Sequence, residues 1–228
     1  MTNGFSEKST PNVLFHNQAD GTFADATVAI GGGAFDGRGV AFADYDRDGD
    51  VDLLVTADAG QPTRLWRNDT VTQNHWLTLQ LIGTRSNRSA IGARVEITTP
   101  LMTTVQEASG GAGRGSFNSL PVEFGLGADT SITQAAIRWP NGDWQTLHDL
   151  DVDQFLVVTE PEWGDLNCDG LVDFDDVDPF VMALSGPEGY LAQFPDCNWY
   201  NADVDSNGFV NFDDIDPFVV LLGLSSRP

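Results

Sequence analysis

One stretch of this sequence occurs twice, and that duplication constrains the fold more than any other feature. Residues 165–176 return as residues 203–214, and nearly identical tails follow at 177–181 and 215–219. A constant offset of 38 residues relates the copies (165 to 203), which marks them as one duplicated structural unit. In each twelve-residue copy, oxygen-bearing side chains occupy positions 1, 3, 5, 9 and 12, and glycine occupies position 6.

This spacing predicts two calcium-binding loops. Calcium takes oxygen ligands, alternate residues of a tightly curved loop point inward, and the glycine permits the sharp turn. Position 7 would add a backbone carbonyl. The alternative is a pair of acidic turns without metal, which we disfavour because both copies match at all of these positions. The expected ligands are Asp165, Asn167, Asp169, Leu171, Asp173 and Asp176, and then Asp203, Asp205, Asn207, Phe209, Asn211 and Asp214.

The loops differ from paired EF-hands because Pro161 and Gly164 oppose a helix before the first loop. A duplicated loop with only an exiting helix resembles the type I dockerin module over residues 164–222, and we assign residues 162–228 to this module. The resemblance implies a unit that requires calcium and docks onto a cohesin-like domain or a cell-surface protein.

The partner surface of such a module is expected beside loop positions 10 and 11. The dockerin family commonly has small hydroxyl residues there, whereas this chain has a Phe-Asp pair in each copy. We also expect each exiting helix to begin at Asp178 or Asp216, as an N-cap followed by proline. The candidate partner-binding residues are Phe174, Asp175, Phe212 and Asp213.

Two cysteines, Cys168 and Cys197, lie in this same segment, which favours a disulfide between them over two free thiols. The bridge would require an oxidising compartment and would stabilise the chain by roughly 3–4 kcal/mol. Phe180 and Phe218 either pack inside the module or join its partner surface. The expected apolar core comprises Val172, Phe180, Val181, Leu184, Val210, Phe218, Val219 and Leu222.

Four aspartates with similar spacing also stand between two apolar strands near the N-terminus. They predict a third calcium loop, against the alternative of an acidic hairpin without metal. Together with residues 17–23, this region resembles the FG-GAP or VCBS repeat, and we assign residues 1–70 to a fragment of a β-propeller blade. The expected ligands are Asp44, Asp46, Asp48 and Asp52, with a backbone oxygen from Asp50.

Alternating apolar residues and regularly spaced turns predict a small β-sandwich or barrel over residues 71–161. Residues 83–88, 91–94 and 138–142 within it resemble the ASPIC/UnbV domain, a resemblance that implies no catalytic site. The expected fold class is therefore mainly β with a small helical calcium-loop module. The core-facing sets are expected to be Leu77, Leu79 and Leu81; Ala93, Val95 and Ile97; Ala135, Ile137 and Trp139; and Phe155 and Val157.

Net charge and the absence of catalytic motifs exclude several classes of function. The net charge of −23 repels nucleic acid and anionic lipid, and no apolar run is long enough to insert into a membrane. None of the three histidines stands in a catalytic motif, so we expect no enzyme activity. The first eight residues contain no apolar stretch typical of a secretion signal, although calcium loops suit extracellular calcium. We therefore expect the natural chain to begin further upstream.

These observations predict a non-enzymatic, calcium-dependent protein of the extracellular space or cell surface. Its C-terminal module would attach the β-domains to a protein partner or surface, and carbohydrate is a further expected ligand class. The alternative is an accessory C-terminal part of a secreted enzyme, or of a polysaccharide-degrading assembly, whose catalytic domain lies upstream.

Overall fold

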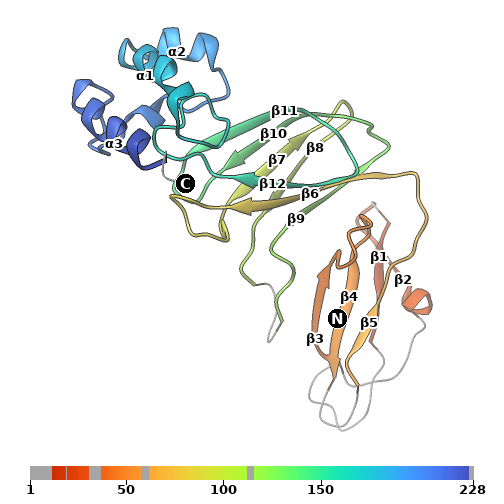
Figure 1. Ribbon diagram of the computed structural model, residues 1–228. Coiled ribbons are helices and arrows are strands. Elements are labelled where there is room, and N and C mark those ends of the chain that lie inside the picture. Colours follow the sequence, from red (N-terminus) through yellow and green to blue (C-terminus); the bar gives the residue numbers. More distant parts are fainter. Residues whose placement is uncertain (1–11, 19, 31–36, 58–61, 112–115, 226–228) are drawn as a thin grey trace. The chain divides into compact units, whose positions relative to one another are not determined.

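The computed structural model describes residues 12–18, 20–30, 37–57, 62–111 and 116–225 (Figure 1). The chain is mainly β and divides into two compact units, each described by itself below. One unit contains Met1–Gln73 with Ser109–Leu120, and the other contains Asn74–Ala108 with Pro121–Pro228. The first eight residues, which contain no apolar stretch typical of a secretion signal, lie outside the described part. Within that part, every helix is too short or too polar to cross a membrane.

The first unit contains a hairpin and a three-stranded antiparallel sheet. Strands β1 (Phe15–Asn17) and β2 (Phe23–Asp25) pair across a turn in which the Asp20 side chain accepts hydrogen bonds from Thr22. A short 3₁₀ helix, η1 (Thr27–Ile30), follows. The sheet has the order β3-β4-β5. Its strands are β3 (Gly37–Ala43), β4 (Asp52–Ala57) and β5 (Arg64–Trp66).

The second unit begins with a sandwich of two sheets (Figure 1). One sheet has the order β11-β10-β7-β8 and is antiparallel, whereas the other has the order β12-β6-β9 and pairs β12 with β6 in parallel. Buried residues of both sheets form one hydrophobic cluster, so the core lies between them. The strands are β6 (His75–Ile82), β7 (Arg94–Thr98), β8 (Thr103–Glu107), β9 (Val122–Gly127), β10 (Ile132–Arg138), β11 (Trp144–Leu150) and β12 (Gln154–Thr159).

The expected core faces of β6, β7 and β10 are buried, but the expectation for β12 was wrong by one residue. Val158 is buried and Leu156 packs against the core, whereas Val157 is 53% exposed. Residues 155–158 are apolar throughout, so alternation could not indicate which side faces inward. Parallel pairing of Leu156 with Leu79 and of Val158 with Leu81 decides it.

The chain then forms the helical module, in which each loop is followed by a 3₁₀ turn and an α-helix. The first copy has η2 (Phe174–Asp176) and α1 (Val177–Leu184), and the second has η4 (Phe212–Asp214) and α3 (Ile215–Ser225). The side-chain caps were expected at Asp178 and Asp216. They lie earlier, at the start of η2 and η4, where Asp173 and Asn211 each form a capping box. Asp178 and Asp216 lie inside the first helical turn.

Two further elements join the copies, and the sequence pattern had not indicated them. They are α2 (Pro187–Gln193) and η3 (Trp199–Ala202). Tyr190 of α2 is fully buried and donates a hydrogen bond to the Leu166 carbonyl at 2.7 Å, which ties this helix to the first loop.

The module core contains Phe180, Phe218 and Leu222, as expected. Val181 and Val219 had been assigned to this core, and that assignment was wrong because both are 57% exposed. Each helix is apolar on more than one side, so the pattern alone did not show which side packs inward.

Candidate metal centres

The two duplicated loops share a set of internal hydrogen bonds. The position-6 amide donates to the position-1 carboxylate in both: Gly170 to Asp165 at 3.1 Å, and Gly208 to Asp203 at 2.8 Å. The position-3 and position-9 amides donate to the position-12 carboxylate in both copies. Positions 4 and 6 have positive φ in both copies, and position 6 is glycine. The duplication therefore extends from sequence to loop geometry.

The carboxylates at both ends of each loop are buried. Asp165 is 1% exposed, and Asp176, Asp203 and Asp214 are similarly enclosed. Oδ1 of Asp165 has no hydrogen-bond partner among the described residues. Burial, together with the neighbouring Asp176 carboxylate, raises the pKa of Asp165 to about 6. A buried, unpartnered carboxylate is costly unless a cation or proton neutralises it.

The second loop brings three carboxylates together. Oxygen atoms of Asp203, Asp205 and Asp214 all lie within 4.8 Å of one another. The first loop has Asn167 where the second has Asp205, so it offers one carboxylate fewer at that position. The remaining predicted ligands are Asp169, Leu171, Asp173, Asn207, Phe209 and Asn211, which lie along the same two loops.

These remaining positions do not all present a side-chain oxygen freely. Leu171 and Phe209 have hydrocarbon side chains, so only their backbone carbonyls could bind a metal. The oxygens of Asp173 and Asn211 accept hydrogen bonds from backbone amides two residues ahead, as helix caps. Position 9 therefore has a capping role that the ligand spacing did not indicate.

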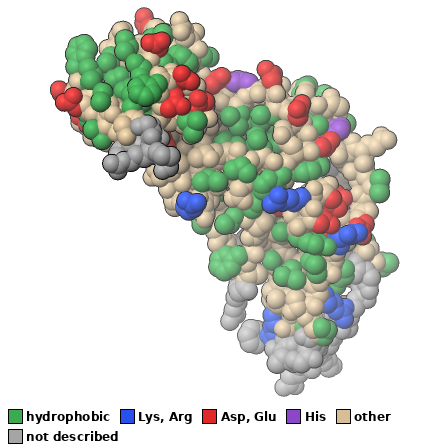
Figure 2. All heavy atoms as spheres, viewed as in Figure 1, with side chains coloured by type: hydrophobic (Ala, Val, Ile, Leu, Met, Phe, Trp, Pro, Cys, Tyr) green, Lys and Arg blue, Asp and Glu red, His purple; other side chains and the backbone are tan. Residues whose placement is uncertain are grey.

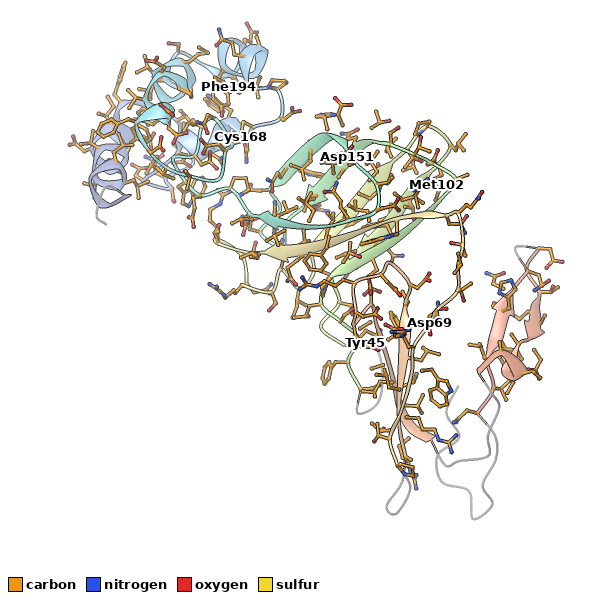
Figure 3. All side chains as sticks on the ribbon, turned by 45° about the vertical axis from the view of Figure 1, so that its right-hand side comes forward. Tyr45, Asp69, Met102, Asp151, Cys168 and Phe194 are labelled. Atoms are coloured by element: carbon orange, nitrogen blue, oxygen red, sulfur yellow. A yellow bond between two sulfur atoms is a disulfide. The ribbon has the colours of Figure 1, made fainter. Side chains whose placement is uncertain are left out.

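A disulfide joins the first loop to the approach of the second. Cys168, labelled in Figure 3, is bonded to Cys197, and their Cα atoms are 5.8 Å apart. Cys168 stands at loop position 4 with φ of 61°, and its counterpart Ser206 has φ of 58°. The bridge is therefore compatible with the loop conformation that both copies adopt.

The aspartate loop of the first unit is only partly assembled. Asp44, Asp46 and Asp48 bring carboxylate oxygens within 4.8 Å of one another. The buried carboxylate of Asp52 instead accepts hydrogen bonds from the amides of Tyr45 at 3.1 Å and Asn68 at 2.7 Å.

Local electrostatics also distinguish this loop from the other two. Partial desolvation and the neighbouring aspartates raise the pKa of Asp46 and of Asp50. However, the Arg67 guanidinium lies 3.6 Å from Asp46 and already supplies positive charge. The carboxylate cluster of the second module loop, Asp203, Asp205 and Asp214, is more buried than the cluster of Asp44, Asp46 and Asp48. It is therefore the stronger candidate for a metal site.

Comparison with known proteins identifies two parts of the chain. Residues 83–164 match the family described as ASPIC and UnbV, and residues 5–55 match the FG-GAP-like repeat. The chain contains an FG-GAP-like repeat and an ASPIC/UnbV domain. Cartilage acidic protein 1 is 54% identical over 46 residues in Homo sapiens and 52% identical over 46 residues in Mus musculus, covering 19% of this chain. These matches span about 7% of the length of those relatives.

One of the candidate loops lies inside a family match, and the two duplicated loops lie outside both matches. The FG-GAP-like repeat includes the loop from Asp44 to Asp52, whereas the ASPIC/UnbV match ends at Gly164, one residue before the first module loop. The duplicated loops therefore form a segment of their own after the ASPIC/UnbV domain.

Both copies in this segment expose the same apolar positions. Phe174 is 74% exposed and Phe212 is 77% exposed, and each stands beside the aspartate predicted with it. On the face drawn in Figure 2, hydrophobic side chains cover much of the module, with acidic groups beside them. The paired exposed residues are Leu171 and Phe209, Phe174 and Phe212, and Val181 and Val219.

Proposed function

We propose that this chain is a calcium-dependent extracellular binding protein, and that residues 162–228 bind two calcium ions and attach it to a protein partner. The buried Oδ1 of Asp165 carries the calcium part of the proposal, because it has no hydrogen-bond partner among the described residues and a bound cation would neutralise the carboxylate. The donor set is carboxylate, amide and backbone oxygen, which suits calcium better than softer metals.

Calcium would act here as a structural ion. The Asp165 and Asp176 carboxylates would hold it in the first loop, and the Asp203, Asp205 and Asp214 carboxylates would hold it in the second. Neutralising these groups would stabilise the loops and the helices that leave them. The blade loop would hold a third ion through Asp44, Asp46 and Asp48.

Equilibrium dialysis of the full chain against calcium tests this proposal. The expected result is three ions bound per chain, with one lost on Asp165→Asn, one on Asp203→Asn and one on Asp44→Asn. Asp178→Asn, which removes an exposed acid outside the loops, is the control and should leave the number unchanged. Equal binding by the three loop variants and the control would refute the calcium assignment.

The partner would bind the exposed apolar residues that both copies present. Phe174 and Phe212 stand out into solvent beside Asp175 and Asp213, which suits a partner groove with an apolar floor and a basic rim. Because the copies match, either one could occupy the same partner site.

A further inference from the structure

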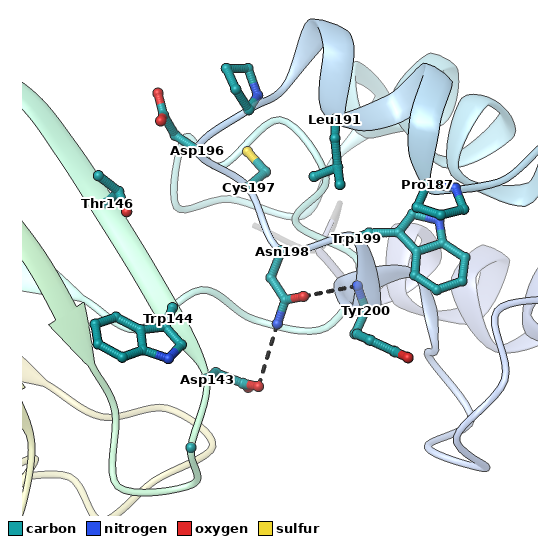
Figure 4. Close-up of a pocket in the computed structure, with 12 residues that line it drawn as sticks. Asp143, Trp144, Thr146, Pro187, Leu191, Asp196, Cys197, Asn198, Trp199 and Tyr200 are labelled. Carbon is teal, nitrogen blue, oxygen red and sulfur yellow. Dashed lines mark hydrogen bonds between the residues drawn. The ribbon is translucent and has the colours of Figure 1, made fainter.

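A cleft of about 530 Å³ lies within the second unit, where the start of β11 faces the segment before the second loop (Figure 4). Its volume falls in the range of small-molecule sites, about 300–1,000 Å³. Trp144 stands on one side, and Trp199 and Tyr200 stand on the other. Trp144 is 54% exposed and Tyr200 is 51% exposed, so both sides present open aromatic surface.

Hydrogen bonds fix the polar floor between these rings. Asn198 caps η3 by accepting from the Tyr200 amide at 3.0 Å, and its Nδ2 lies 3.4 Å from Oδ1 of Asp143 (Figure 4). From outside the cleft, the Arg85 guanidinium holds Oδ2 of Asp143 at 2.6 Å and stacks over Trp163 at 4.2 Å. The position of Asp143 is therefore set before any ligand arrives.

The cleft favours a ligand rich in hydrogen-bond donors. Asp143 and Asp196 line the cleft, and each carboxylate can accept about four hydrogen bonds. Asp143 already accepts from Arg85, Asn141 and Asn198, so its remaining capacity lies mainly on Oδ1. Asp196 uses one with His148 at 2.9 Å, which leaves it further capacity. The described residues that line the cleft include neither Lys nor Arg, so the lining offers no cationic side chain to an anionic ligand.

We propose that this cleft binds a neutral oligosaccharide. A pyranose ring has a face of C–H groups and a rim of hydroxyls. Trp144 and Tyr200 would stack against the C–H faces, while Asp143 and Asp196 would accept hydrogen bonds from the hydroxyls. A proline-rich peptide also binds between aromatic rings, and the indole and phenol groups of Trp144 and Tyr200 could donate to its carbonyls. It has few donors of its own for the Asp143 and Asp196 carboxylates, however, whereas a saccharide presents many hydroxyls.

Calorimetric titration of the full chain at saturating calcium tests the proposal, with cellohexaose, xylohexaose and laminarihexaose as probes. We expect one of these to bind with a stoichiometry of one. Trp144→Ala and Tyr200→Ala should each weaken binding by at least about tenfold. Tyr200→Phe should retain most of the affinity because the ring is kept. If Trp144→Ala fails to fold, Thr146→Trp should abolish binding by filling the cleft from β11.

Phe174→Ala combined with Phe212→Ala is the matched control, since it removes two exposed rings of the same module outside the cleft. This variant should bind the saccharide normally while losing the proposed protein partner, so failure of one proposal is distinguishable from failure of the other. Binding of none of the three probes overturns the oligosaccharide proposal. So does affinity that is unchanged by Trp144→Ala and Tyr200→Ala, or capture of a proline-rich decapeptide instead.

Discussion

Phe180 and Phe218 stack face to face in the module core, with ring centroids 4.1 Å apart and ring planes 13° from parallel. They occupy the same position in the two copies, 38 residues apart (180 to 218). Two equivalent residues of a duplicated unit touch each other when an approximate two-fold axis that relates the copies passes between them. The pair therefore shows that the two copies pack against each other through equivalent residues.

Phe180→Ala is expected to destabilise the module by about 3–5 kcal/mol, because it removes a buried ring and leaves its stacking partner beside a cavity. The neighbouring Val181→Ala is the control, since that side chain is exposed, and it should change the free energy of unfolding by less than about 0.5 kcal/mol. Urea unfolding in calcium, followed by circular dichroism, measures both. Similar losses for the two variants would show that this stacked pair does not organise the core.

Asp165 predicts a pH dependence of stability in the metal-free protein. Its pKa is about 6 in the folded chain against an ordinary value of 3.8, so folding favours the protonated form. The stability of the metal-free module should therefore fall as the pH rises between these two values. The difference corresponds to roughly 3 kcal/mol when the carboxylate is fully ionised.

Asp165→Asn isolates this contribution in chelator. The variant should be more stable than the wild type at pH 7, and the two should converge near pH 4. Saturating calcium should reverse the order at pH 7, because the variant lacks a ligand. The argument fails if the wild type and the variant have equal stability in chelator at pH 7.

Glu160 holds the loop that positions Arg85. Its Oε2 accepts hydrogen bonds from the amides of Thr84, Arg85 and Ser86 at 3.0, 3.1 and 2.7 Å. Glu160→Ala should lower the free energy of unfolding by about 2–4 kcal/mol, since it leaves three partly buried amide donors unpaired. The exposed Glu162→Ala is the control and should have little effect. Thermal unfolding of both variants in calcium measures the two effects. An equal loss of stability in the two would contradict this role of Glu160.

The duplicated module predicts two equivalent ways of docking. Replacing Phe174 and Asp175 by alanine should leave partner capture nearly intact, and so should the same change at Phe212 and Asp213. The combined fourfold variant should lose capture, because neither copy then presents its aromatic ring. Pull-down from the source's secreted proteins, repeated with the purified partner, provides the measurement. Loss of capture in either half-variant alone would show that the copies are not equivalent.

The Cys168–Cys197 disulfide is expected to stabilise the module by about 3–4 kcal/mol, given the loop it closes. Replacing both cysteines by serine should lower the unfolding midpoint. It should also weaken calcium binding in the first loop, which contains Cys168, more than in the second. Calcium titration of the double variant with Asp203→Asn, and separately with Asp165→Asn, distinguishes the two loops. Equal weakening in both would indicate a general effect on the module.

Local patterns determined much of this protein from the sequence. The spacing of the oxygen-bearing residues and the glycine at position 6 lie within twelve residues, so the two duplicated turns could be predicted without tertiary information. Calcium binding by these turns stays a prediction. The apolar alternation that placed Leu77, Leu79 and Leu81 on the core side of β6 was likewise sufficient without tertiary information. In each case, neighbours in the chain are sufficient to specify the local geometry.

Tertiary structure decided the burial and the contacts that depend on residues far apart in the sequence. The inward face of β12 could not be chosen within an apolar run, and only pairing with β6 places Val158 inside. Val181 is as apolar as a core residue, yet it is exposed because the packing around Phe180 and Phe218 leaves it outside. Trp144 and Tyr200 line one cleft only because β11 meets the module, and no sequence pattern records a contact between side chains so far apart in the chain.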